Sequence, residues 1–245
     1  MFGQSRNLGA ICLLLKRLNP LIFSSSSLNI VKQLVKLSTN QRPIVAQLLR
    51  VCVSPNAIAS RMLRKIRMAM GHRDSVYRLH DLIEMDDAFV GGRRSGKRGR
   101  GAEGKFPVWV AVENRDKRAG FIALQQVPAV TKKAVAKFVQ GHLSLNQSVR
   151  SDAFASLTEI GKTQQHTARV TPPDMAGEWL PWVHIAIGNL KAFLLGTDHG
   201  VSAKYLQEYL NEFCYRFNRR SWEAELPLRL LNACLMHTQV KLSIV

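Results

Sequence analysis

The order of the elements predicted between residues 80 and 152 constrains the fold of this chain more than any other feature. Three strands are predicted over Leu82–Val90, 106–112 (FPVWVAV) and 121–127 (FIALQQV), and the last two are joined by a polar turn. Thr131 is placed to cap a helix, and a short fourth strand over 147–151 follows it. The apolar stripe of that helix consists of Val135, Phe138 and Val139.

Asp86 and Asp152 are the candidate catalytic carboxylates of this arrangement. Asp86 lies on the first predicted strand and Asp152 at the end of the fourth, so the two meet if these strands are neighbours. Two close carboxylates repel each other unless a divalent cation lies between them, and hard oxygen ligands suit Mg²⁺ or Mn²⁺. Two such ions about 4 Å apart activate a water or hydroxyl and stabilise the leaving oxygen in phosphodiester chemistry. The spacing alone equally fits two unrelated surface carboxylates, and alternation along the strand turns the adjacent Asp87 to the opposite face.

The charge of the chain favours a polyanionic partner. Lys and Arg number 35 against 17 Asp and Glu, which gives a net charge of +18, and no acidic residue precedes Asp74. Nucleic acid is the usual partner of such an excess, although a solvated basic surface is the alternative. The four cysteines form no C-x-x-C pair, which excludes an ordinary zinc ribbon and favours a reducing, cytoplasmic location.

A glycine-rich basic loop follows the first strand. A loop of this composition cannot fold alone and is expected to become ordered on a phosphate backbone, unless it is simply solvated. Its candidate DNA contacts are Arg93, Arg94, Lys97, Arg98, Arg100 and Lys105.

The N-terminal part divides into a stretch over 1–40, predicted to be poorly ordered or truncated, and a helical segment over 41–78. Ser54-Pro55 predicts the start of a basic helix, and a helix before it gives the outline of a helix-turn-helix, which many two-helix hairpins share. Its candidate DNA contacts are Arg61, Arg64, Lys65 and Arg67. The apolar run near residue 12 is too short to span a bilayer, so no membrane partner is expected.

The C-terminal half is predicted to hold a connection over 161–179 with turns and few apolar residues, a helix over 182–197, and a long helix with Ser202 as N-cap. The apolar stripe of the long helix consists of Leu206, Tyr209, Leu210, Phe213 and Phe217. Its end carries Arg216, Arg219 and Arg220, which are candidate phosphate contacts or solvated surface residues.

Four motifs together resemble bacterial insertion-sequence transposases of the ISXO-like group, which are DDE-type enzymes. They are EMDDAFVGG, RGRGAEGK, SDAF and HGVSAKYLQEYLNEFCYRFNRR, and the resemblance covers roughly residues 79–220. It implies an α/β, ribonuclease-H-like mixed sheet flanked by helices and preceded by a small helix-turn-helix-like segment. It also implies a catalytic domain over 79–225 before a helical tail over 226–245, with Asp86 and Asp152 as the first and second catalytic aspartates.

The third catalytic position departs from the simplest family pattern. Lys191 matches the lysine of the family, but the residue seven positions before it is His184 where a glutamate is usual. His184 and Lys191 share a helix face, and neutral imidazole ligates Mn²⁺ better than Mg²⁺. Parts of the family carry Asn in place of the acid, which makes Asn189 the second candidate. Geometry favours His184, and loss of the third ligand is the remaining alternative.

The resemblance implies a transposase that uses a two-metal Mg²⁺ or Mn²⁺ site for DNA end cleavage and strand transfer of an insertion sequence. Its partners would be the terminal inverted repeats, target DNA and further copies of the chain. Lys191 would contact phosphate near the scissile bond. Because the third carboxylate is missing, an inactive remnant that only binds DNA is the alternative.

Overall fold

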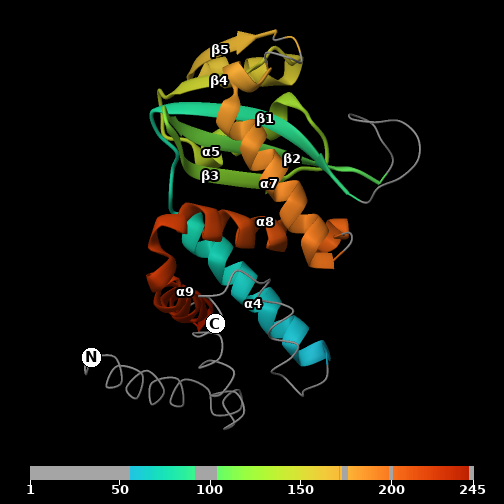
Figure 1. The fold of residues 1–245 in the computed structure, drawn as a ribbon, viewed down its shortest axis with the longest axis vertical. Helices are drawn as coiled ribbons and strands as arrows, with labels where there is room; N and C mark the ends of the chain where they lie inside the picture. The colour runs from blue at the N-terminus through green and yellow to red at the C-terminus, as the bar shows by residue number, and fades with distance from the viewer. Residues whose placement is uncertain (1–55, 92–103, 171, 173–175, 199–200, 243–245) are drawn as a thin grey trace. The chain divides into compact units, whose positions relative to one another are not determined.

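The computed structural model describes residues 56–91, 104–170, 172, 176–198 and 201–242 (Figure 1). The chain divides into two compact units, and the sheet with its covering helices belongs to the unit formed by Arg64–Ser221 and Asn232–Val245. The packing described below lies within that unit. Residues 1–55 lie outside the described residues. They include the stretch over 1–40, the first helix of the expected helix-turn-helix, and Ser54-Pro55 at the start of the second. The helix-turn-helix outline and the domain boundaries therefore stay predictions.

A five-stranded mixed sheet forms the centre of this unit. In chain order its strands are β1 Leu82–Val90, β2 Phe106–Arg115, β3 Arg118–Gln126, β4 Ser148–Asp152 and β5 Gln165–Arg169. Across the sheet the order is β3-β2-β1-β4-β5. The first three strands form an antiparallel meander, whereas β4 runs parallel to β1 and β5 parallel to β4. This confirms the expected mixed sheet with its first and fourth strands side by side.

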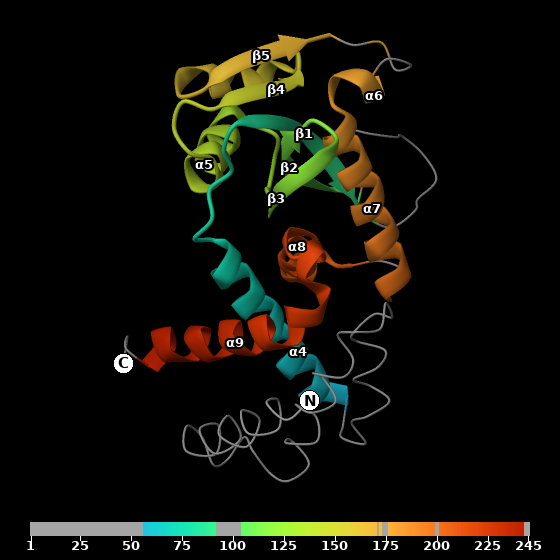
Figure 2. The same ribbon diagram turned by 60° about the vertical axis from the view of Figure 1, so that its left-hand side comes forward.

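Helices cover both faces of the sheet because its central strands are apolar on both sides (Figure 2). Along β2, Val110 belongs to one core cluster and the neighbouring Trp109 to the other, and both are fully buried. Helix α5 (Lys132–His142) packs on the Trp109 side, while α7 (Pro181–Asp198) and α8 (Ala203–Asn218) pack on the other. Each fully buried side chain such as Phe138 contributes about 1.5–3 kcal/mol relative to exposure.

The predicted cap and stripe of α5 are confirmed. Thr131 accepts a hydrogen bond from the backbone N–H of Ala134, and Val135, Phe138 and Val139 are buried. The turn expected over 114–120 is shorter than predicted, because β2 continues to Arg115 and β3 begins at Arg118. Asp116 occupies the left-handed region with φ of 54° in this turn.

The connection expected over 161–179 also contains strand β5, which was not predicted. The 3₁₀ helix η1 (Ala155–Lys162) leads into β5, and the short helix α6 (Ala176–Trp179) follows it. Strand β5 is largely exposed and is held by backbone pairing with β4 rather than by an apolar face. His166 on β5 lies 2.7 Å from the Ser151 hydroxyl through its Nε2 atom.

Helix α8 begins as predicted after Ser202, but the Ser202 side chain makes no capping hydrogen bond. Of its predicted stripe, Phe217 is partly buried and the other residues are buried, namely Leu206, Tyr209, Leu210 and Phe213.

The outer edge of β3 is covered by amide side chains of α8. Asn218 accepts a hydrogen bond from the Ile122 N–H at 2.8 Å and donates to the Ile122 carbonyl at 3.1 Å. About three turns earlier on α8, Gln207 accepts from the Gln126 N–H at 2.8 Å and donates to the Leu124 carbonyl at 3.3 Å. These four backbone groups of the edge strand are therefore paired within the molecule.

The remaining helices are α4 (Asn56–Asp74), the irregular η2 (Arg220–Glu225) and α9 (Leu226–Leu242). Among the helices that the structure describes, none combines the length and the apolar character needed to cross a membrane.

Candidate active site

Three carboxylates gather where β4 ends beside β1. Asp86, Asp87 and Asp152 are each partly buried, and each offers one oxygen within 4.8 Å of the others. The parallel register pairs Met85 with Ser151, so the next residues along, Asp86 and Asp152, emerge side by side on one face. The pairing of β1 with β4 thus brings Asp86 and Asp152 together, as the strand order predicted.

Asp87 joins this group, although alternation along the strand assigns it to the opposite face. The recorded pairing between β1 and β4 stops at Met85 and Ser151. Beyond this point one carboxylate oxygen of Asp87 lies within 4.8 Å of those of Asp86 and Asp152. The Asp86 carboxylate also accepts a hydrogen bond from the Asp87 N–H at 2.7 Å.

The chemistry of this donor set fits a hard divalent cation. Carboxylate oxygens are the ligands that Mg²⁺ and Mn²⁺ prefer, and an ion between them removes their mutual repulsion. Within the part of the chain that the structure describes, this is the one cluster of three or more acidic, His or Cys side chains with such spacing.

His184 lies beside the carboxylates. It is the fourth residue of α7, and its Nδ1 atom is 3.9 Å from Asp86 Oδ2. Burial lowers the pKa of His184 below its usual value, while the charge of Asp152 acts in the opposite direction. A lowered pKa keeps the imidazole neutral near pH 7, which is the form that ligates a metal. Asn189 and Lys191 occupy exposed positions farther along the same helix.

Glu84 is a buried acid that the sequence did not single out. It precedes Asp86 by two residues on the same face of β1 and is 0% exposed. Its carboxylate accepts hydrogen bonds from the Val183 N–H at 2.8 Å and from Asn114 Nδ2 at 2.7 Å. Burial raises the pKa of Glu84, and these hydrogen bonds with the charge of Arg150 act against the rise.

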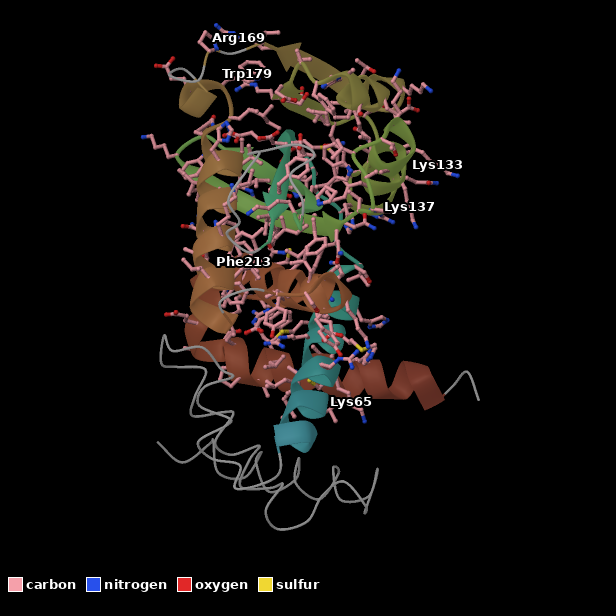
Figure 3. All side chains as sticks on the ribbon, turned by 90° about the vertical axis from the view of Figure 1, so that its right-hand side faces the viewer. Lys65, Lys133, Lys137, Arg169, Trp179 and Phe213 are labelled. Carbon is pink, nitrogen blue, oxygen red and sulfur yellow. The ribbon has the colours of Figure 1, made fainter. Side chains whose placement is uncertain are left out.

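Two arginines and a tryptophan flank the carboxylates and were also missed. The guanidinium carbons of Arg150 and Arg169 lie 5.0 and 5.7 Å from the ring centroid of Trp179, whose indole N–H donates to the Ser151 carbonyl at 2.9 Å (Figure 3). Arg169 pairs in register with Asp152, and Arg150 precedes Asp152 by two residues on β4. Both arginines are therefore on the Asp152 face of the sheet. The sequence could have placed Arg150 on the Asp152 face, because it lies two residues before Asp152 on a predicted strand. It could not have placed Arg169 there, because β5 was not predicted.

Two of the predicted DNA contacts, Arg67 and Arg219, are buried. Arg67 is 5% exposed, and its Nε atom lies 2.8 Å from Glu212 Oε2. Arg219 is also 5% exposed and pairs with Asp74 at 2.7 Å. Arg67 is therefore paired with a buried carboxylate and Arg219 with a partly buried one.

The other predicted DNA contacts have mixed surroundings. Arg64 pairs with Glu208 at 3.0 Å, Lys105 donates to the Gly91 carbonyl at 3.0 Å, and Lys65 is exposed. Arg216 lies 3.8 Å from Glu212, and Arg220 donates to the carbonyls of Ala119 and Gly120. The side chains outside the described residues are those of Arg61, Arg93, Arg94, Lys97, Arg98 and Arg100.

Comparison with known families gives one match, over residues 78–218, to the family model described as the ISXO2-like transposase domain. The chain belongs to this transposase family. The matched region of the transposase domain runs from just before β1 to the end of α8, so it contains the three carboxylates, His184 and Lys191.

Solved structures similar to this transposase domain include the catalytic domain of Mos1 mariner transposase, at 13% identity and a TM-score of 0.34, covering 72% of this chain and 93% of that one. The Mos1 strand transfer complex matches at 13% identity and a TM-score of 0.34, covering 84% of this chain and 77% of that one. The Mos1 paired-end complex with the left transposon end matches at 12% identity and a TM-score of 0.35, covering 84% and 78%. No curated protein matches the chain.

Proposed function

We propose that the chain is an active transposase that cleaves DNA at the ends of an insertion sequence and joins the freed 3′ hydroxyl to target DNA. The observation that carries the proposal is the meeting of Asp86, Asp87 and Asp152 within 4.8 Å, in a chain of a transposase family. Its DNA substrate would place the protein at the nucleoid, in the cytoplasm, acting as a multimer on paired ends.

The carboxylates of Asp86 and Asp152 would hold Mg²⁺ or Mn²⁺, with Asp87 as an additional oxygen donor and His184 as a neutral nitrogen ligand. When bound, the metal would supply Lewis-acid activation of the attacking water or hydroxyl and neutralise charge on the leaving oxygen. His184 is favoured over Asn189 because its Nδ1 atom lies 3.9 Å from Asp86 Oδ2.

The remaining residues of the site would orient the nucleic acid. Arg150 and Arg169 stand on the Asp152 face beside Trp179, where they would neutralise phosphates next to the scissile one. Lys191 would reach a phosphate from the exposed part of α7. The described basic side chains that remain outside buried ion pairs, such as Lys65, would add sequence-independent contacts.

A cleavage assay on DNA that carries an element end tests this proposal. Asp86→Asn and Asp152→Asn are expected to abolish cleavage in Mg²⁺ or Mn²⁺ while leaving DNA binding, because each removes a metal-bridging charge and no phosphate contact. Asp81→Asn, at an aspartate 77% exposed just before β1, is the matched control and is expected to keep cleavage. Wild-type cleavage by Asp152→Asn would refute the assignment.

The same assay separates the candidates for the third ligand. His184→Ala is expected to reduce cleavage and to remove any preference for Mn²⁺, whereas Asn189→Ala is expected to retain both. Binding of end DNA by the wild-type protein with no cleavage in either metal would instead favour the inactive, DNA-binding remnant.

A further inference from the structure

Glu84 is a fully buried carboxylate that stands outside the group of three, and its partners identify what it does. A buried ionised carboxylate is strongly disfavoured unless hydrogen bonds replace its lost hydration. The bonds that stabilise Glu84 come from two other elements, α7 and β2, so the side chain connects three parts of the fold.

The first connection is to the start of α7. The backbone N–H groups of Trp182 and Val183 donate to the Glu84 carboxylate, the latter at 2.8 Å. The N–H groups in the first turn of a helix have no acceptor within the helix, and an anion there is favoured by the helix dipole. The helix has no acidic residue in its first turn, and Leu180 occupies the position where Ser, Thr, Asp or Asn would cap it. Glu84 therefore supplies from β1 the cap that the helix lacks in its own sequence.

The second connection ties the same helix end to the turn between β2 and β3. Asn114 donates to Glu84 at 2.7 Å and accepts from the Asp116 N–H at 2.8 Å. The Asp116 carbonyl accepts in turn from the Trp182 indole N–H at 3.1 Å. A register shift in the β2–β3 pairing, between Val112 and Asn114, precedes this linkage.

His184 is the next residue after Val183, so the Glu84 cap acts on the turn that carries His184 to Asp86. We infer that Glu84 is a positioning residue: its buried carboxylate anchors the first turn of α7 and thereby holds His184 3.9 Å from Asp86. This inference rests on the proposed metal site, in which His184 is a ligand. Glu84 itself touches neither substrate nor metal.

The test uses the whole chain with Glu84→Gln, which keeps the size of the side chain but places an amide among hydrogen-bond donors. Mn²⁺ binding measured by titration calorimetry is expected to weaken about 10- to 100-fold, the usual effect of losing a residue that orients a ligand. In the metal-free protein, hydrogen exchange of the first turn of α7 is expected to accelerate. This second readout needs neither metal nor activity.

Glu113→Gln is the matched control. Glu113 is likewise buried, at 1% exposed, and accepts from the Phe121 N–H at 2.9 Å and from Arg115 at 2.6 Å. It holds β-strand backbone rather than α7, so its loss is expected to lower thermal stability while Mn²⁺ affinity and exchange in α7 stay at wild-type values.

A double-substitution cycle separates positioning from a general loss of structure. If Glu84 acts through His184, then Glu84→Gln weakens Mn²⁺ binding in the wild-type background and adds less than about twofold in the His184→Ala background. Equal weakening in both backgrounds, or wild-type affinity in Glu84→Gln, overturns the inference. If Glu84→Gln does not fold, Asn114→Ala replaces it, with a smaller loss of affinity expected and an unchanged affinity counting against the inference.

Failure of the proposed function gives a different pattern. Absence of Mn²⁺ binding by the wild-type protein refutes the metal site, and exchange of α7 in the metal-free variants then decides the role of Glu84 as its anchor. Unchanged exchange in Glu84→Gln overturns that role.

Discussion

His142 at the end of α5 illustrates how burial of one residue sets a pH dependence. Burial, with the nearby charge of Arg78, lowers the pKa of His142 to about 4, whereas an unfolded chain has a histidine pKa of about 6.5. Between about pH 6.5 and about pH 4 the folded protein therefore binds fewer protons than the unfolded chain. The free energy of unfolding falls as the pH falls through this range. The loss attributable to His142 is about 3 kcal/mol.

Urea denaturation at about pH 7 and about pH 4.5 measures this effect. His142→Gln removes the titrating group, so this variant is expected to lose less stability on acidification than the wild-type protein. Equal losses in His142→Gln and wild type would contradict the prediction.

Single residues also mark where sequence reasoning stopped. The proposed roles of Asp86 and Asp152 followed from strand order and family resemblance, and their strands are neighbours as expected. Arg67 was expected on the surface. Its partner Glu212 is 145 residues away, and the sequence around Arg67 contains no signal for such a pair. Alternation along β1 did not predict that Asp87 would join the other carboxylates, because the pairing with β4 ends at Met85. The role of Glu84 could not be predicted from the sequence, because it depends on the position of α7.

At the scale of elements, the contact of α4 with α8 depends on charged pairs of unequal burial. Arg67 and Glu212 are 6% and 5% exposed in their side chains, and the Arg67 guanidinium also lies 3.9 Å from the centroid of Tyr209. One turn earlier on each helix, Arg64 is 45% exposed and pairs with Glu208 at 3.0 Å.

Glu212→Ala is expected to lower the free energy of unfolding by about 3–5 kcal/mol, because it leaves the buried guanidinium without a counter-charge. Glu208→Ala removes the equivalent partner at an exposed pair and is expected to change it by about 1 kcal/mol or less. Chemical denaturation of both variants measures the difference. Similar losses in the two would show that burial does not govern this contact.

The elements differ in how strongly the sequence specified them. Strand β1 was predicted with its observed bounds, because a glycine pair follows its apolar run. Helix α5 was predicted with its cap, because Thr131 precedes a helical apolar stripe. Strand β5 was missed because QHTAR buries no apolar face and exists through its pairing with β4. Its absence from the prediction also concealed Arg169.

At the scale of the whole molecule, the net charge of +18 predicts a salt-sensitive grip on DNA. Arg169→Gln is expected to weaken binding of end DNA and to lower the slope of log affinity against log salt by about 1, because one phosphate contact is lost. Fluorescence anisotropy across a salt series measures both.

Lys133→Gln is the control for charge alone. Lys133 is exposed on α5, which covers the face of the sheet opposite Asp152 (Figure 3). Its slope is expected to equal that of the wild-type protein. An equal decrease of the salt slope in both variants would contradict the prediction, because it would indicate that DNA is attracted by the overall charge and not by a site beside the carboxylates.

The amide side chains of Asn218 and Gln207 along β3 bear on how copies of this chain can associate. An unprotected border strand is a template on which an incoming polypeptide can polymerise. In this protein Asn218 and Gln207 already hydrogen-bond to the edge of β3. An added strand would have to displace both amides before it could hydrogen-bond to Ile122, Leu124 or Gln126. Addition of a strand at this edge of the sheet would therefore first cost the molecule these four internal hydrogen bonds.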